Sequence, residues 1–142
     1  MNEISVNKPH WSFWVITIIM LVWNVMGSIN FIVQMNPDMV SSYRETEQAI
    51  IQHRPIWATL GFAVAVFGGA VGCIFLILKK SIAFYLFVSS LMGVVITITH
   101  TLGAGIDFSA GELIGIIFMP VAVAAFLVWY AKYCESKGWV ST

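Results

Sequence analysis

Charged residues are scarce in this chain: lysine, arginine, aspartate and glutamate make up 10% of its 142 residues, and their formal charges cancel to zero. A chain without a basic surplus has no electrostatic basis for binding nucleic acid or an acidic macromolecule. Hydrophobic residues instead make up 59% of the sequence. This composition is typical of an integral membrane protein, and the short length predicts a single domain over residues 1–142.

The sequence also lacks the motifs of metal chemistry and covalent catalysis. Its two cysteines, Cys73 and Cys134, form no CxxC pair, and its three histidines, His10, His53 and His100, share no ligand spacing. No HExxH, GxSxG or Walker glycine loop is present. We therefore expect no enzyme activity, no catalytic residue, no metal and no cofactor.

Four long apolar segments dominate what is present, at about residues 11–35, 56–78, 81–102 and 113–133. Because about 20 apolar residues cross a bilayer core roughly 30 Å thick, each segment is long enough to span a membrane. The sequence thus predicts an all-α polytopic membrane protein whose four transmembrane helices form an up-down bundle. The lipid bilayer is its first expected partner.

Polar signals mark the connections between these spans. Ser42 and Glu45 fit a capping box in the first connection, which predicts a short amphipathic helix on the membrane surface; the alternative is a solvated connector. Ser109 and Glu112 fit a second capping box that opens the last span. Pro120 lies inside that span and lacks a backbone N–H, so we expect a kink there.

Polar side chains in the first and third spans share one face of each helix. At about 100° per residue, Asn24, Asn30 and Gln34 fall within one arc, and Thr97 and His100 within another. Unpaired amides are costly in hydrocarbon, so these groups need partner helices or a water-filled cavity. A simpler role for His100 is pairing with Asp107 or reaching the interface. The predicted ligand-binding residues are Asn24, Asn30, Gln34, Thr97, His100, Asp107 and Glu112.

Small residues recur at three- and four-residue spacing in the second span. Such a stripe lets helix backbones approach closely inside a membrane. We therefore predict that it packs helices and does not bind a ligand. The predicted helix-packing residues are Gly61, Gly68, Gly69 and Gly72.

Positive residues are distributed unequally between the two sides of the predicted bundle. Two arginines, Arg44 and Arg54, lie on one side. Lysine and arginine concentrate on cytoplasmic loops, so the richer side predicts cytoplasmic N- and C-termini and a pocket that opens outward. The five lysines of that richer side are Lys8, Lys79, Lys80, Lys132 and Lys137.

Several segments resemble a set of small bacterial four-helix inner-membrane proteins that genome annotation often labels sugar transporters. They are KPHWSFW, WNVMGSINF, RPIWATLGFAVAVFGG and the histidine-bearing third span. The resemblance implies transport and a bacterial inner membrane, and it brings no residue roles with it.

Two functions follow as expectations. The first is a transporter or channel for a small neutral, sugar-like solute, because amides and hydroxyls suit an uncharged ligand. Four spans are few for a transport pathway, so this function predicts a homo-oligomer. The alternative is a non-catalytic accessory subunit of a larger membrane complex, in which the same polar faces only pair helices.

The predicted orientation can be tested by cysteine labelling from outside the cell. A membrane-impermeant thiol reagent should reach a cysteine introduced at Ser41 or Ser109, because both connections lie outside. It should not reach one at Ser81 or Ser136. The opposite labelling pattern would overturn the orientation.

Overall fold

The computed structural model describes residues 8–141, and 79% of these residues are helical. No β-strand occurs within this described range. The prediction of an all-α protein is confirmed at this level. In chain order the helices are α1 (Trp11–Gln34), α2 (Pro37–Val40), α3 (Glu45–Gln52), α4 (Ile56–Ile77), α5 (Ala83–Gly103), α6 (Ala110–Leu113), the π-helix η1 (Ile114–Phe118) and α7 (Met119–Ser136).

Among the described residues, four helices are long and apolar enough to cross a membrane. They are α1, α4, α5 and the continuous helix Ala110–Ser136, which consists of α6, η1 and α7. Large apolar side chains such as Ile18, Leu60 and Phe118 point outward and are more than half exposed. Such surfaces are stable where lipid covers them, so the chain has the features of a multi-pass membrane protein.

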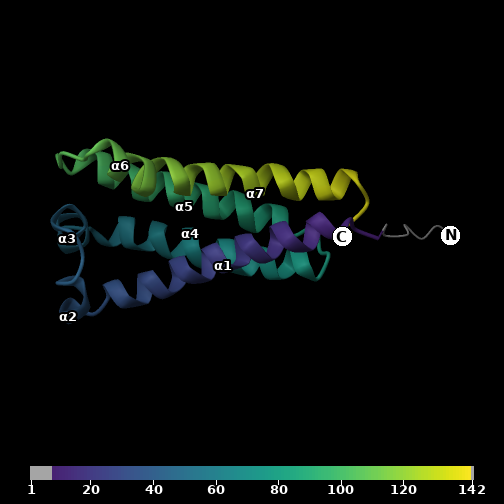
Figure 1. Ribbon diagram of the computed structural model, residues 1–142, viewed down its shortest axis with the longest axis horizontal. Helices are drawn as coiled ribbons and strands as arrows, with labels where there is room; N and C mark the ends of the chain where they lie inside the picture. Colours follow the sequence, from purple (N-terminus) through teal and green to yellow (C-terminus); the bar gives the residue numbers. More distant parts are fainter. Residues whose placement is uncertain (1–7, 142) are drawn as a thin grey trace.

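The four long helices lie side by side, with the start of α1 and the end of α7 at one end of the molecule (Figure 1). The short helices α2, α3 and α6 lie at the opposite end (Figure 1). α4 packs against both α1 and α5, and α5 also packs against α7. The end that holds α2, α3 and α6 is called the α3 end below.

The main hydrophobic core fills the half of the molecule nearer the chain ends. Phe13, Leu76, Phe87 and Leu127 are at most 1% exposed there, and each comes from a different long helix. A smaller buried cluster, Ala65, Val94 and Ala124, lies farther toward the α3 end. Side chains therefore close one half of the molecule more completely than the other.

The first connection differs from its predicted form. α3 begins at Glu45 with Arg44 at the cap position and no side-chain cap, so the expected Ser42–Glu45 capping box is wrong. The Ser42 hydroxyl instead donates to the Met39 carbonyl at 2.7 Å. It closes the turn after α2, because Pro37 has already started that short helix.

The last span begins with the predicted capping box. The Glu112 backbone N–H donates to Ser109 Oγ at 3.2 Å, and the Ser109 N–H donates to the Glu112 carboxylate at 3.0 Å. The helix therefore starts at Ala110, before the expected residue 113. The irregularity expected at Pro120 takes the form of the π-helix η1 just ahead of it.

The glycines predicted to pack helices lie against neighbouring helices. A Cβ atom added at Gly72 would come within 2.6 Å of the Phe87 ring on α5, and one at Gly69 would overlap the Asn24 amide on α1. Gly68 also faces α5, at an ordinary contact distance of 3.6 Å. The small residues of α4 therefore pack against two neighbouring helices, α1 and α5.

Gly61 on α4 meets Gly93 on α5. A Cβ atom at Gly93 would lie 2.5 Å from the Gly61 carbonyl oxygen and 2.7 Å from the Ala65 backbone nitrogen. Nearby, the Ser90 hydroxyl donates to the Ala65 carbonyl at 2.6 Å and joins the two helices directly. Because backbone atoms cannot rotate away as a side chain can, this approach requires glycine at position 93.

The substitution Gly93→Ala should lower the free energy of unfolding by about 1 to 3 kcal/mol, the usual cost of overpacking. Gly103→Ala in the same helix is the control, because no atom lies within 4 Å of the added methyl group there. Thermal unfolding in detergent measures both. Equal midpoints for the two variants and the unmodified chain would contradict the close approach of α4 and α5.

Candidate functional site

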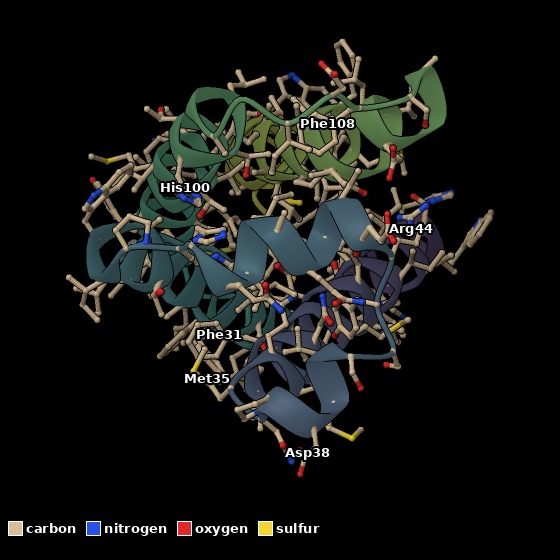
Figure 2. All side chains as sticks on the ribbon, turned by 90° about the vertical axis from the view of Figure 1, so that its left-hand side faces the viewer. Phe31, Met35, Asp38, Arg44, His100 and Phe108 are labelled. Carbon is tan, nitrogen blue, oxygen red and sulfur yellow. The ribbon has the colours of Figure 1, made fainter. Side chains whose placement is uncertain are left out.

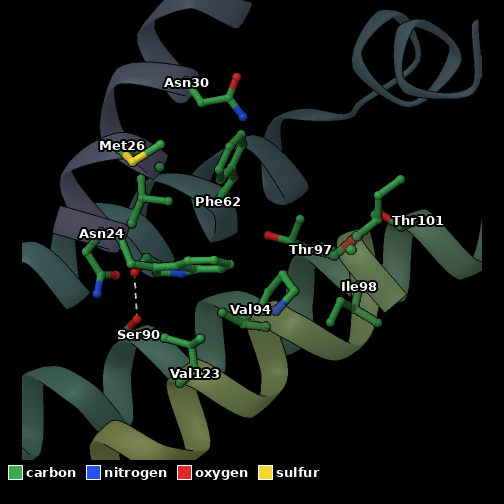
Figure 3. A pocket seen from close by; sticks show the side chains of 18 of the residues that line it. Asn24, Met26, Asn30, Phe62, Ser90, Val94, Thr97, Ile98, Thr101 and Val123 are labelled. Carbon is green, nitrogen blue, oxygen red and sulfur yellow. Dashed lines mark hydrogen bonds between the residues drawn. The ribbon is translucent and has the colours of Figure 1, made fainter. Parts of the chain in front are cut away.

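A cavity of about 570 Å³ lies between the long helices, on the α3 side of the main core. α1, α4, α5 and α7 all contribute to its walls, together with η1 and α3. Most of the wall is apolar, as Met26, Phe62, Val94, Ile98 and Val123 illustrate (Figure 3). The volume falls within the range of about 300 to 1,000 Å³ that small-molecule sites occupy.

Polar groups at the inner end of the cavity are already bonded to the protein. Asn24 is 6% exposed, and its amide nitrogen donates to the Met20 carbonyl at 2.9 Å. Ser28 donates to the Asn24 carbonyl at 2.9 Å, and Ser90 makes the bond to α4 described above (Figure 3). The bonds of Asn24 and Ser28 lie within α1 and that of Ser90 joins two helices, so these residues leave few free donors for a ligand.

The α5 wall offers hydrogen-bond acceptors. Thr97 donates its hydroxyl to the Gly93 carbonyl at 2.9 Å, and Thr101 donates to the Thr97 carbonyl at 3.1 Å. Both threonines line the cavity one helical turn apart (Figure 3). Because each hydroxyl proton is used within the helix, the remaining lone pairs can accept a hydrogen bond from a ligand.

The outer end of the cavity offers donors. Asn30 Oδ1 accepts from the Tyr43 hydroxyl, and Gln34 Oε1 accepts from Arg54 Nη1 at 2.9 Å. Both amide oxygens are therefore engaged, whereas neither amide nitrogen has a hydrogen-bond partner among the described residues. Asn30, Gln34 and Arg54 all line the cavity.

Arg54 is the half-buried cation of this outer end. Its guanidinium lies 4.8 Å from the centre of the Phe62 ring, and its Nε is buried without a partner among the described residues. Burial lowers the pKa of Arg54, because desolvation disfavours the charged form. An arginine still keeps its charge at neutral pH, so a positive group faces the cavity.

The helix α3 covers the cavity at this end. Figure 2 views the molecule from the α3 end and shows α3 lying across the long helices. Its residues Glu47, Ile50 and Ile51 line the cavity. Access from this side therefore requires α3 to move.

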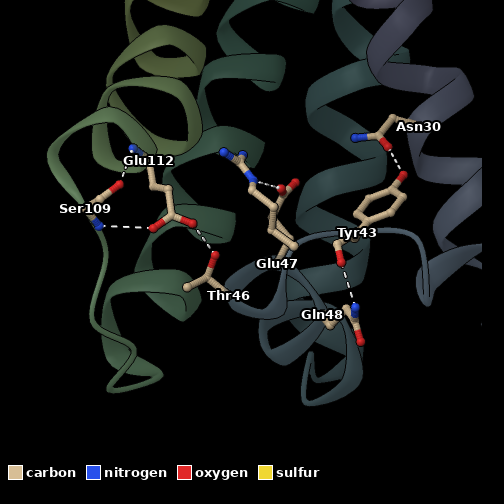
Figure 4. A network of polar contacts seen from close by, with 8 residues as sticks. Asn30, Tyr43, Thr46, Glu47, Gln48, Ser109 and Glu112 are labelled. Carbon is tan, nitrogen blue, oxygen red and sulfur yellow. Dashed lines mark hydrogen bonds and ion pairs between the residues drawn. The ribbon is translucent and has the colours of Figure 1, made fainter.

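Two hydrogen bonds tie this cover to the long helices on either side. The Tyr43 hydroxyl donates to Asn30 on α1, and the Thr46 hydroxyl donates to Glu112 on α6 (Figure 4). Within the connection, Arg44 forms an ion pair with Glu47 at 2.6 Å. Hydrogen bonds from two neutral hydroxyl groups thus hold α3 and its flanking turn at both edges, and such bonds can break and reform.

Three of the predicted ligand-binding residues do not line the cavity: His100, Asp107 and Glu112. The His100 ring packs edge-on against Trp57, with ring centroids 5.9 Å apart. α5 turns Thr97 and Thr101 toward the cavity, so His100 points to a different side of the helix. Asp107 makes no ion pair with His100 or any other described residue, and Glu112 caps α6.

Four of the predicted residues do line it, namely Asn24, Asn30, Gln34 and Thr97. Sequence reasoning placed Arg54 on the same side of the membrane but left it out of the site. Its position could have indicated a role in the site. Arg54 lies directly before the second span, on the side of the membrane where the amides of the first span end. Tyr43 and Thr101 gave no comparable signal, because hydroxyls are common in connections and helices.

The described residues contain no group of three or more His, Cys, Asp or Glu side chains arranged to hold a metal ion. No family model matches the chain, and neither a curated protein nor a solved structure matches it. Its function is therefore argued from the covered cavity, whose acceptors lie on α5 and whose donors lie beneath α3.

Proposed function

We propose that this chain is a membrane transporter or channel for a small solute, with the cavity as its binding site. The supporting observation is a ligand-sized cavity among membrane-spanning helices, bounded at one end by packed core and covered at the other by a short helix.

In this proposal α3 is the amphipathic surface helix of an up-down bundle and acts as a gate. Its Ile50 is 5% exposed and faces the cavity, while Glu45 lies at its exposed start. Opening requires the bonds of Tyr43 and Thr46 to break, and the neutral bond between Tyr43 and Asn30 has a net cost of about 1 kcal/mol. Such a cost is compatible with motion on the timescale of transport.

The proposed location is a bacterial inner membrane with both termini in the cytoplasm, so that the α3 end faces outward. The lysine distribution supports this orientation. The packed core of one chain interrupts any path to the other side. We therefore propose that the chain acts as a homo-oligomer, in which movement between copies completes the path.

The accessory-subunit alternative has support in one observation, the bonded polar groups at the inner end. Ser90 joins α5 to α4, and Asn24 fills the space that Gly69 leaves. These contacts pair helices, as that alternative requires. They do not account for the free donors of Asn30, Gln34 and Arg54, so transport remains the preferred function.

The proposal can be tested by filling the cavity. Ile116→Trp adds a large ring to the cavity wall, whereas Ile114→Trp adds the same ring to a neighbouring residue that is 54% exposed and does not line it. Native mass spectrometry of protein purified in mild detergent should detect a bound small molecule. Ile116→Trp should lose that molecule and Ile114→Trp should keep it.

Uptake of the identified molecule into proteoliposomes should follow the same order among the variants. Asn30→Ala should also weaken binding, whereas His100→Gln should not, because only Asn30 lines the cavity. A chain that copurifies with a stoichiometric larger partner and without a small molecule would instead favour the accessory subunit.

A further inference from the structure

We propose that the solute is an amphipathic anion, whose acidic head binds Arg54 beneath α3 and whose apolar chain fills the inner cavity. This inference rests on the proposed function and narrows its substrate class. It replaces the neutral, sugar-like ligand expected from the amides alone.

The head-group site is built around a cation that is incompletely paired. Arg54 donates through Nη1 to the Gln34 oxygen at 2.9 Å, which is a neutral partner. Its buried Nε has no partner, and no carboxylate forms an ion pair with it among the described residues. A half-buried guanidinium without a counter-ion strongly favours the binding of an acidic ligand, because charge-assisted hydrogen bonds are stronger than neutral ones.

The amides beside Arg54 also favour an acidic group on the ligand. The oxygens of Asn30 and Gln34 are taken by Tyr43 and Arg54, so that their NH₂ groups remain as donors. A carboxylate or phosphate group accepts hydrogen bonds only, and it could take donors from all three residues. A sugar hydroxyl would gain less from these donors, because it carries no charge and forms no ion pair with Arg54.

The acidic residue nearest this site is already occupied. Glu47 lines the cavity, and its carboxylate is held by Arg44 Nε at 2.6 Å. Glu112, the other acid close to α3, accepts from Thr46 and from the Ser109 N–H and does not line the cavity (Figure 4). Arg54 therefore remains the uncompensated charge of the outer end.

The inner cavity suits an apolar chain. Val94, Ile98, Val123 and Leu127 form its walls, and the polar groups Asn24 and Ser90 are bonded to the protein. A polyol placed against these apolar side chains would lose more hydrogen bonds to water than they can replace, which disfavours its binding. A hydrocarbon chain would instead gain from leaving water.

The full-length protein in zwitterionic phosphatidylcholine nanodiscs tests this inference. Equilibrium dialysis at alkaline pH compares labelled dodecanoate with dodecanol, with empty nanodiscs subtracted. We expect dodecanoate to bind about ten- to a hundredfold more tightly than dodecanol, the ratio that charged hydrogen bonds give. Arg54→Gln should abolish this preference while dodecanol still binds, and Arg54→Lys should keep part of it.

Lys80→Gln is the matched control, because it removes one positive charge from an exposed side chain at the opposite end. It should keep the full preference. Equal binding of acid and alcohol to the unmodified chain, or a preference that survives Arg54→Gln, would overturn the inference. If Arg54→Gln does not fold, the ratio of dodecanoate to dodecanol affinity is compared between the unmodified chain and Arg54→Lys. A ratio that does not fall in Arg54→Lys would overturn the inference.

The same assay separates this inference from the proposed function. If neither probe saturates, the amphipathic ligand is refuted, and the proposed function depends on whether native mass spectrometry finds another bound molecule. If Ile116→Trp binds both probes as the unmodified chain does, the cavity is not their binding site and both proposals fail. If both probes bind equally and Ile116→Trp blocks them, only the acidic head is refuted. The acidic head could belong to a membrane lipid or to a free acid, and anionic phosphatidylglycerol in the nanodiscs distinguishes the two. If the lipid competes with dodecanoate, the ligand is a membrane lipid; if it does not compete, the ligand is a free acid.

Discussion

The close approach of α4 and α5 is the contact on which the rest of the structure depends. At Gly61 and Gly93 the two backbones come so near that one methyl group would collide with main-chain atoms. The Ser90 hydroxyl adds a hydrogen bond across the same contact. Since lipid gives helices no hydrophobic reason to associate, packing and hydrogen bonding of this kind must hold the pair together. α1 and α7 then pack on this pair from either side.

The cavity follows from how α1 and α7 are arranged around that pair. Near the chain ends, Phe13 of α1 and Leu127 of α7 join one packed cluster. Toward the α3 end the two helices lie farther apart (Figure 1), and the cavity lies between the four helices there. Smaller side chains such as Ala65 and Ala124 form the boundary between the two halves. One end of the molecule is thus filled by packed side chains, and the other holds the cavity that α3 covers.

Much of this fold could be predicted from the sequence, because its strongest signals are local. Uninterrupted apolar runs gave the four spans, and the Ser109–Glu112 spacing gave the capping box that opens the last one. The site was predicted less well. A helical wheel places Thr97 and His100 on one broad face, but it does not give the rotation of α5 within the bundle. Packing against α4 sets that rotation, and it leaves His100 beside Trp57. Arg54 was missed because a connection has no periodicity from which its direction can be read.

The central claim is that water and solutes reach the cavity between the helices from the α3 end when α3 moves. Labelling with a small, charged, water-soluble thiol reagent tests it most directly, with Thr97→Cys on the cavity wall and Thr99→Cys on the exposed, lipid-facing side of the same helix. The native Cys73 and Cys134 are both buried and set the background. The account predicts that the reagent, added on the α3 side of oriented membranes, labels Thr97→Cys and not Thr99→Cys. Protection of Thr97→Cys together with labelling of Thr99→Cys, or protection of both, would contradict it.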